Sequence, residues 1–150
     1  MRIRTMVAVL FAGLATGGPA FADDLLLSKG DATVLIESNI GKPYWQMEAQ
    51  CAGMLGAAYA YSNDHHRPAE AERSKDAGIA MLNEAIARLQ VDRGIDQPTA
   101  LNLAAVEVET GRAGAKVVLE RQGSGPTSGF NMMRSACSDI SAAQRHHLAR

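Results

Sequence analysis

Two pairs of adjacent histidines are the residues best suited to bind a transition metal, because a neutral imidazole is a good ligand for zinc, copper and nickel. The pairs are His65–His66 and His146–His147. Met47 adds a thioether that, with His147, could provide the two axial ligands of a non-covalent haem. Neighbouring helical residues point about 100° apart, so one pair does not readily chelate an ion. We therefore expect no metal and no cofactor, and keep His146, His147 and Met47 as candidate ligands of a metal or haem carrier.

Catalytic motifs are missing from the sequence. It contains no G-x-S-x-G, no H-E-x-x-H, and no phosphate-binding or dinucleotide-binding glycine pattern. It also lacks the C-x-x-C-H of covalent haem attachment. Glu107 and Glu109 are two residues apart, so on a helix they face different directions. We therefore predict a protein without enzymatic activity, and an enzyme of unrecognised class is the most distant alternative.

The N-terminus has the three parts of a secretory signal peptide. Arg2 and Arg4 supply positive charge, an uncharged apolar run follows, and Ala20-Phe21-Ala22 is an A-x-A cleavage site. The apolar run is shorter than the roughly 20 residues of a membrane-spanning helix. We predict a cleavable signal peptide at residues 1–22, export by the Sec route to the periplasm or beyond, and no stable membrane insertion after cleavage.

The chain that remains after cleavage has the size and charge of one mildly acidic domain. It keeps 128 of the 150 residues, with 13 basic against 16 acidic residues and a net charge of −3. This charge gives no electrostatic attraction to nucleic acid or to an anionic membrane surface. We therefore expect neither of them as a partner.

Export also bears on the two cysteines, Cys51 and Cys137. In an oxidising compartment, two cysteines are normally joined. We predict a disulfide between them, and free thiols acting as metal ligands or nucleophiles are the alternative.

Four stretches have the apolar periodicity of amphipathic helices. The first begins at Pro43 and ends at Asn63–Asp64, and the second covers Pro68–Arg93. The third starts behind Asp96 and stops before the break at 123–126, and the fourth covers Ser128–His147. The residues expected to face the core are Tyr44, Met47, Cys51, Met54, Ala58 and Tyr61; Ile79, Leu82, Ile86 and Leu89; Leu101, Ala104, Val108, Gly111, Ala115 and Val118; and Phe130, Met133, Cys137, Ile140, Gln144 and His147.

Four such helices with three short connections predict an all-α, antiparallel four-helix bundle over residues 42–150, preceded by an N-terminal arm at 23–41. Cys51 and Cys137 lie on the core stripes of the first and last helices, at heights that differ by roughly 3 Å. The bundle therefore allows their disulfide. Gly111 and Gly114 each cost about 1 kcal/mol relative to alanine in a helix, which indicates close helix packing at both.

Trp45 lies one position off the core stripe of the first helix. It either packs beneath the N-terminal arm or is exposed as the anchor of a protein interface, a role that aromatic side chains often fill. We keep Trp45 as the candidate interface residue.

The functional expectation follows from these patterns. The sequence predicts an exported, soluble helical protein of the bacterial periplasm that binds an envelope protein through its helix faces and has no catalytic activity. A carrier of a metal, haem or another small ligand is the alternative.

Overall fold

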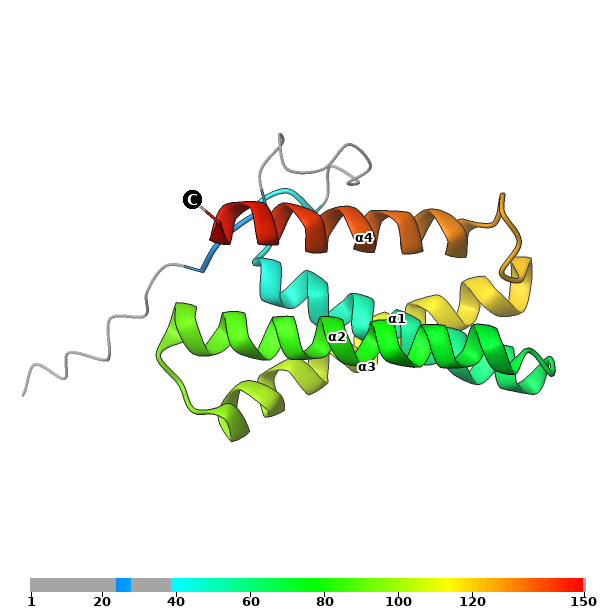
Figure 1. Ribbon diagram of the computed structural model, residues 1–150, viewed down its shortest axis with the longest axis horizontal. Coiled ribbons are helices and arrows are strands. Elements are labelled where there is room, and N and C mark those ends of the chain that lie inside the picture. The colour runs from blue at the N-terminus through cyan, green and yellow to red at the C-terminus, as the bar shows by residue number, and fades with distance from the viewer. Residues whose placement is uncertain (1–23, 28–38, 150) are drawn as a thin grey trace, which may run out of the picture.

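Four α-helices form the described part of the protein (Figure 1). The computed structural model describes residues 24–27 and 39–149. The helices are α1 (Tyr44–Asp64), α2 (Pro68–Arg93), α3 (Gln97–Gln122) and α4 (Gly129–Leu148). The predicted all-α class and the number of helices are confirmed. The predicted signal peptide lies outside the described residues, as does the arm segment 28–38.

Capping residues account for the helix boundaries. The Asp96 side chain accepts a hydrogen bond from the Thr99 N–H (3.0 Å), and the Ser128 hydroxyl accepts one from the Asn131 N–H (3.2 Å). Each satisfies a donor that the first turn of a helix leaves free. Gly94 ends α2 in the left-handed conformation, with φ of 61°, which glycine adopts without strain.

α1 is the central helix of the fold. It lies between α4 on one side and α2 with α3 on the other (Figure 1). Most of its residues are buried, whereas α3 buries only Ala100, Ala104, Ala115 and Leu119. The helices around α1 therefore depend on it for their packing.

The backbones of α1 and α3 touch where they cross, at Gly53 and Gly111. A Cβ atom at Gly53 would lie 1.8 Å from the Val108 carbonyl oxygen, and one at Gly111 would lie 1.9 Å from the Gln50 carbonyl oxygen. Only glycine fits at either position. The predicted close packing is confirmed at Gly111 and is wrong at Gly114, where a Cβ atom would meet nothing within 4 Å.

Two residues of the predicted core stripes are on the surface instead. Ile79 is 53% exposed and Leu101 is 45% exposed. On α2 the buried side runs through Gly78 and Ala85, because a small residue lets α1 approach: a Cβ atom at Gly78 would lie 3.3 Å from that of Leu55. The closest helix contacts thus select small side chains over large apolar ones.

The predicted disulfide between Cys51 and Cys137 is present and joins α1 to α4. The two Cα atoms are 5.7 Å apart, a normal separation for a disulfide. The first and last helices are therefore covalently linked near the middle of each.

The described residues of the N-terminal arm pair with the start of α1. The Leu27 N–H donates to the Lys42 carbonyl, and the Tyr44 N–H donates to the Leu25 carbonyl, both at 2.9 Å. The Leu27 side chain is buried, with 2% of its surface exposed. Within the described residues, no helix is long and apolar enough to cross a membrane.

Candidate functional site

An apolar groove opens between α1, α3 and α4. It encloses about 500 Å³, a volume in the range of small-molecule sites. Among the described residues that line it, only three side chains, those of Asn39, Gln50 and Thr110, can form ordinary hydrogen bonds. The other lining residues are Met47, Cys51, Met54, Gly111, Gly114, Gly129, Met132, Met133, Ala136, Cys137 and Ile140.

The groove exists because α3 and α4 each pack on α1 and make few contacts with one another. α1 and the Cys51–Cys137 disulfide form its floor. Gly114 on one wall and Ala136 on the other have almost no side chain to fill the space between the helices. The groove is therefore a property of helix placement, and no single motif marks it.

Methionine is the commonest large residue of the lining. Met54 is buried at the floor, where its Sδ lies 4.0 Å from the Cys137 sulfur, and Met132 at the rim is 61% exposed. A methionine side chain is unbranched and polarisable, so it adapts to irregular apolar shapes. This lining suits a flexible apolar ligand.

A second unusual region, which we call the acid cluster, lies where α1, α2 and α4 meet. It comprises Glu48, Glu84, Ser141, Gln144 and Arg145. Glu48 is fully buried, beside the Glu84 carboxylate and the Gln144 amide, without a well-formed hydrogen bond to either carboxyl oxygen. Burial, and then the neighbouring Glu84, raise the pKa of Glu48 to about 9. Glu48 is therefore a neutral carboxylic acid at pH 7.

Glu84 differs from Glu48 because it has partners. The Ser141 hydroxyl donates to Glu84 Oε2 (2.6 Å), and Arg145 Nη1 donates to Glu84 Oε1 (3.2 Å). Arg145 also donates to the Ser141 hydroxyl (2.7 Å). The acid cluster thus links α4 to α2 by polar contacts, and α1 contributes the uncharged acid Glu48.

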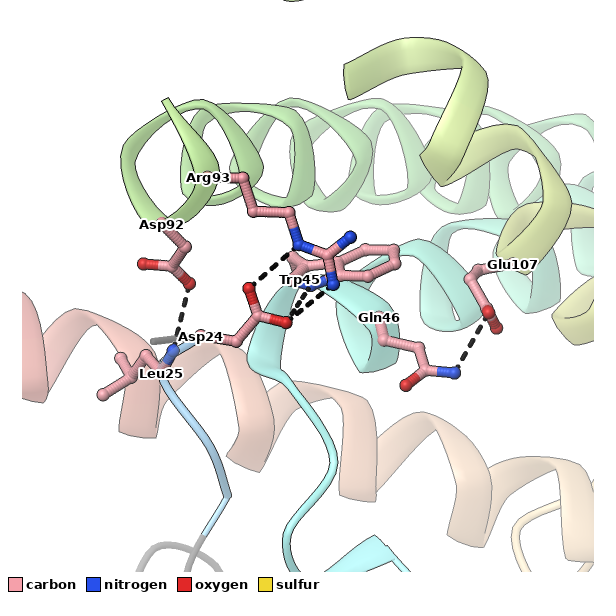
Figure 2. A network of polar contacts seen from close by, with 7 residues as sticks. All are labelled: Asp24, Leu25, Trp45, Gln46, Asp92, Arg93 and Glu107. Carbon is pink, nitrogen blue, oxygen red and sulfur yellow. Dashed lines mark hydrogen bonds and ion pairs between the residues drawn. The ribbon is translucent and has the colours of Figure 1, made fainter. Parts of the chain in front are cut away.

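Figure 2 shows where Trp45 lies, in a group of polar contacts that we call the N-terminal clamp. Arg93 donates two hydrogen bonds to Asp24 (2.8 and 3.1 Å), and its guanidinium lies 5.0 Å from the centre of the Trp45 ring. The indole N–H of Trp45 also donates to Asp24 (3.3 Å), and the Leu25 N–H donates to Asp92 (3.0 Å). The hydrogen bond from Arg93 lowers the pKa of Asp24.

The exposed fraction of Trp45 decides between the two predictions for this residue. Only 7% of its surface is exposed. The interpretation of Trp45 as an exposed interface residue is wrong, and packing beneath the arm is confirmed. The reason is that the indole packs in a core cluster with Leu89 of α2 and Ala100 of α3, while Asp24 accepts from its N–H and the Arg93 guanidinium lies over its ring.

The histidine pairs lie at opposite ends of α1. His65 stacks on Tyr61 with ring centres 4.0 Å apart, whereas His147 meets the edge of Tyr44 at 5.8 Å. Met47 lines the apolar groove. Within residues 24–27 and 39–149, no group of three or more histidine, cysteine, aspartate or glutamate side chains could hold a metal ion.

Comparisons with known proteins give no match to a protein-family model, to a curated protein or to a solved structure. The functional argument therefore rests on the groove and on the chemistry of the residues around it.

Proposed function

We propose that this protein is an exported, non-catalytic binding protein that holds a small apolar molecule in the groove between α1, α3 and α4. The observation that carries the proposal is the groove itself, a space of about 500 Å³ with an almost wholly apolar lining. Pockets of this size and composition are the usual sites of small-molecule binding.

The driving force would be the hydrophobic effect. Each methylene group that moves from water into such a lining contributes about 0.8 kcal/mol. The methionines can adapt to the ligand, while the disulfide and the backbone contacts at Gly53 and Gly111 keep the walls in place. Preformed walls reduce the ordering cost that otherwise weakens binding.

Export is the second part of the proposal. It is supported by the signal-peptide pattern at residues 1–22 and by the disulfide, which is typical of oxidising compartments. The expected product in the periplasm begins at Asp23 and has no free thiol. Intact mass measured before and after alkylation checks both points, and a full-length chain with two alkylated cysteines would contradict them.

Binding can be tested with N-phenyl-1-naphthylamine, an uncharged probe that becomes fluorescent in apolar sites. Gly114→Leu is the matched variant, because a Cβ atom at this position would meet nothing within 4 Å and Gly114 lines the groove. Ala113→Leu is the control, since it adds the same side chain to the exposed neighbouring position outside the lining.

The expected result is saturable fluorescence with the wild type and with Ala113→Leu, and at least tenfold weaker binding by Gly114→Leu. Equal binding by both leucine variants would place the probe elsewhere on the surface. Either that result or no saturable signal with the oxidised wild type would contradict the proposal.

A second candidate function is contact with another envelope protein, favoured by an uncharged exposed strip on α3. The strip contains Leu103, Val106 and Val117, which are 37%, 67% and 46% exposed. A photoreactive residue at Val106 should give one defined cross-linked product in the periplasm that Val117→Asp abolishes. The same residue at Lys116, on the charged side of α3, should give none.

A further inference from the structure

The polar side chains of the groove gather at one end. Gln50 and Thr110 come together where α1 and α3 cross, since Gly111 lies against the Gln50 backbone. Asn39 precedes α1 by five residues and lines the same N-terminal part of the groove. We call this end the polar end; it is lined by Asn39, Gln50 and Thr110.

The described residues that line the opposite end include no polar side chain. Because α1 and α4 run antiparallel through the Cys51–Cys137 disulfide, Met54 lies at the level of Met133. Gly129, at the start of α4, continues this end, and its N–H is satisfied by Gln122 of α3 (2.8 Å). The groove therefore changes from hydrogen-bonding to purely apolar along its length.

Two charged side chains near the polar end are hydrogen-bonded to neutral amides. The Lys42 ammonium donates to Asn39 Oδ1 (2.9 Å), and the Glu107 carboxylate accepts from Gln46 (3.0 Å) and Gln50 (2.7 Å). The two charges are opposite in sign, and none of the described lining residues is ionisable, since both cysteines form the disulfide. An ionic group of either sign brought to this end would lose water and would meet a like charge as well as an unlike one.

We propose that the ligand is a single-chain amphiphile with an uncharged polar head, such as a monoacylglycerol or a long-chain alcohol. The acyl or alkyl chain lies at the end formed by Met54, Gly129 and Met133, and the head hydrogen-bonds to amide and hydroxyl groups at the polar end. This inference rests on the proposed function, because it names the ligand class of the same groove.

The test compares three amphiphiles with a 12-carbon chain that differ in the head. 1-Monolauroylglycerol, laurate and dodecyltrimethylammonium are titrated below their micelle concentrations at pH 8 against the oxidised protein with bound N-phenyl-1-naphthylamine. The glyceride is expected to displace the probe at a concentration at least tenfold lower than either ion. A tenfold difference corresponds to about 1.4 kcal/mol, the least that one unpaired buried charge should cost.

Thr110→Val tests the head contact at nearly the same side-chain volume. The Thr110 hydroxyl donates to the Val106 carbonyl (3.1 Å), so it would accept a hydrogen bond from the head. The variant should bind the glyceride several-fold more weakly and keep the wild-type affinity for the probe, because the probe is not expected to hydrogen-bond at the polar end. Ser138→Ala, an exposed hydroxyl change on α4 outside the groove lining, is the control and should change neither.

The outcomes separate the two proposals. Equal displacement by the glyceride and laurate, or stronger displacement by laurate, would contradict the claim that the ligand has an uncharged head. The groove would still be a binding site. If none of the three displaces the bound probe, the proposal that the ligand is a single-chain amphiphile is wrong. Absence of probe binding itself contradicts the proposed function.

Discussion

The two walls of the groove are held in place by different kinds of interaction. α3 is fixed to α1 by direct backbone contact at Gly53 and Gly111. α4 is attached through the Cys51–Cys137 disulfide and through polar contacts of the acid cluster, and its packing on α1 is less extensive. One wall is thus positioned by shape, and the other by a covalent tether and hydrogen bonds. We infer that the position of α4 sets the width of the groove.

Breaking the tether should have the largest effect. Replacing both Cys51 and Cys137 by alanine removes a link that spans 86 residues, worth about 4–5 kcal/mol as an upper figure in the chain-entropy model. We expect the melting temperature, followed by circular dichroism, to fall by about 10 °C or more. Reduction of the wild type should give a fall of similar size, and a loss of only one or two degrees in both experiments would show that packing alone holds α4.

Glu48→Gln should act in the opposite direction and stabilise the protein. The unfolded chain releases the Glu48 proton near pH 4.5, whereas the folded protein keeps it to about pH 9. The contribution of Glu48 to stability is therefore fully present below pH 4.5 and falls by up to about 1.4 kcal/mol per pH unit as the pH rises toward 9. Glutamine cannot ionise, so this part of the pH dependence should disappear.

Urea unfolding at pH 5 and pH 8 measures this difference. The gain from Glu48→Gln should be small at pH 5 and amount to a few kcal/mol at pH 8. Glu109→Gln is the control, since Glu109 is well exposed on α3, and it should change stability little at either pH. A gain from Glu48→Gln that does not depend on pH would mean that Glu48 is not kept protonated by folding.

Replacing two glycines of α3 by alanine should have opposite effects on stability, because Gly111 contacts α1 and Gly114 faces open space. Gly111→Ala forces a Cβ atom against the Gln50 carbonyl, and such overpacking costs typically 1–3 kcal/mol. Gly114→Ala meets no neighbour and should stabilise α3 by up to about 1 kcal/mol. Chemical denaturation of both variants checks the sign of each change, and equal effects would contradict the difference between the two positions.

The smallest effect is expected in the N-terminal clamp, where the polar groups are partnered. Asp24→Asn removes the ion pair with Arg93 and should cost about 1 kcal/mol, because the pair is partly exposed. Since the pKa of Asp24 is lowered by Arg93, this contribution is present near neutral pH and is lost as the pH falls below about 4. The emission of Trp45, the sole tryptophan, should shift toward longer wavelength in the variant and remain constant in Asp76→Asn.

Much of the helical fold could be predicted from the residues. Pro68, Asp96 and Ser128 mark helix starts by local chemistry, and the apolar periodicity alone predicts Cys51 and Cys137 on facing stripes. Ile79 and Leu101 were assigned to the core because they are large and apolar. Neither is buried, since close helix contacts select small residues such as Gly78. The periodicity of apolar residues in a sequence gives no distance between the helices, so it cannot show where contacts are this close.

The groove and the acid cluster were not found in the sequence. The groove depends on how far α3 and α4 stand apart, which is set by contacts at Gly53 and Gly111 and by the disulfide. Glu48 did carry a signal: it lies four residues after Tyr44 and three before Cys51, which is the spacing of the buried stripe. A carboxyl group at such a position predicts either a buried partner or a raised pKa.

The measurement that tests the central claim most directly is the ratio of two dissociation constants for N-phenyl-1-naphthylamine, that of Gly114→Leu to that of Ala113→Leu. Both proteins should be oxidised and should unfold at temperatures close to that of the wild type. The groove proposal predicts a ratio of ten or more, because only the first leucine occupies the space between α3 and α4. A ratio near one would contradict it.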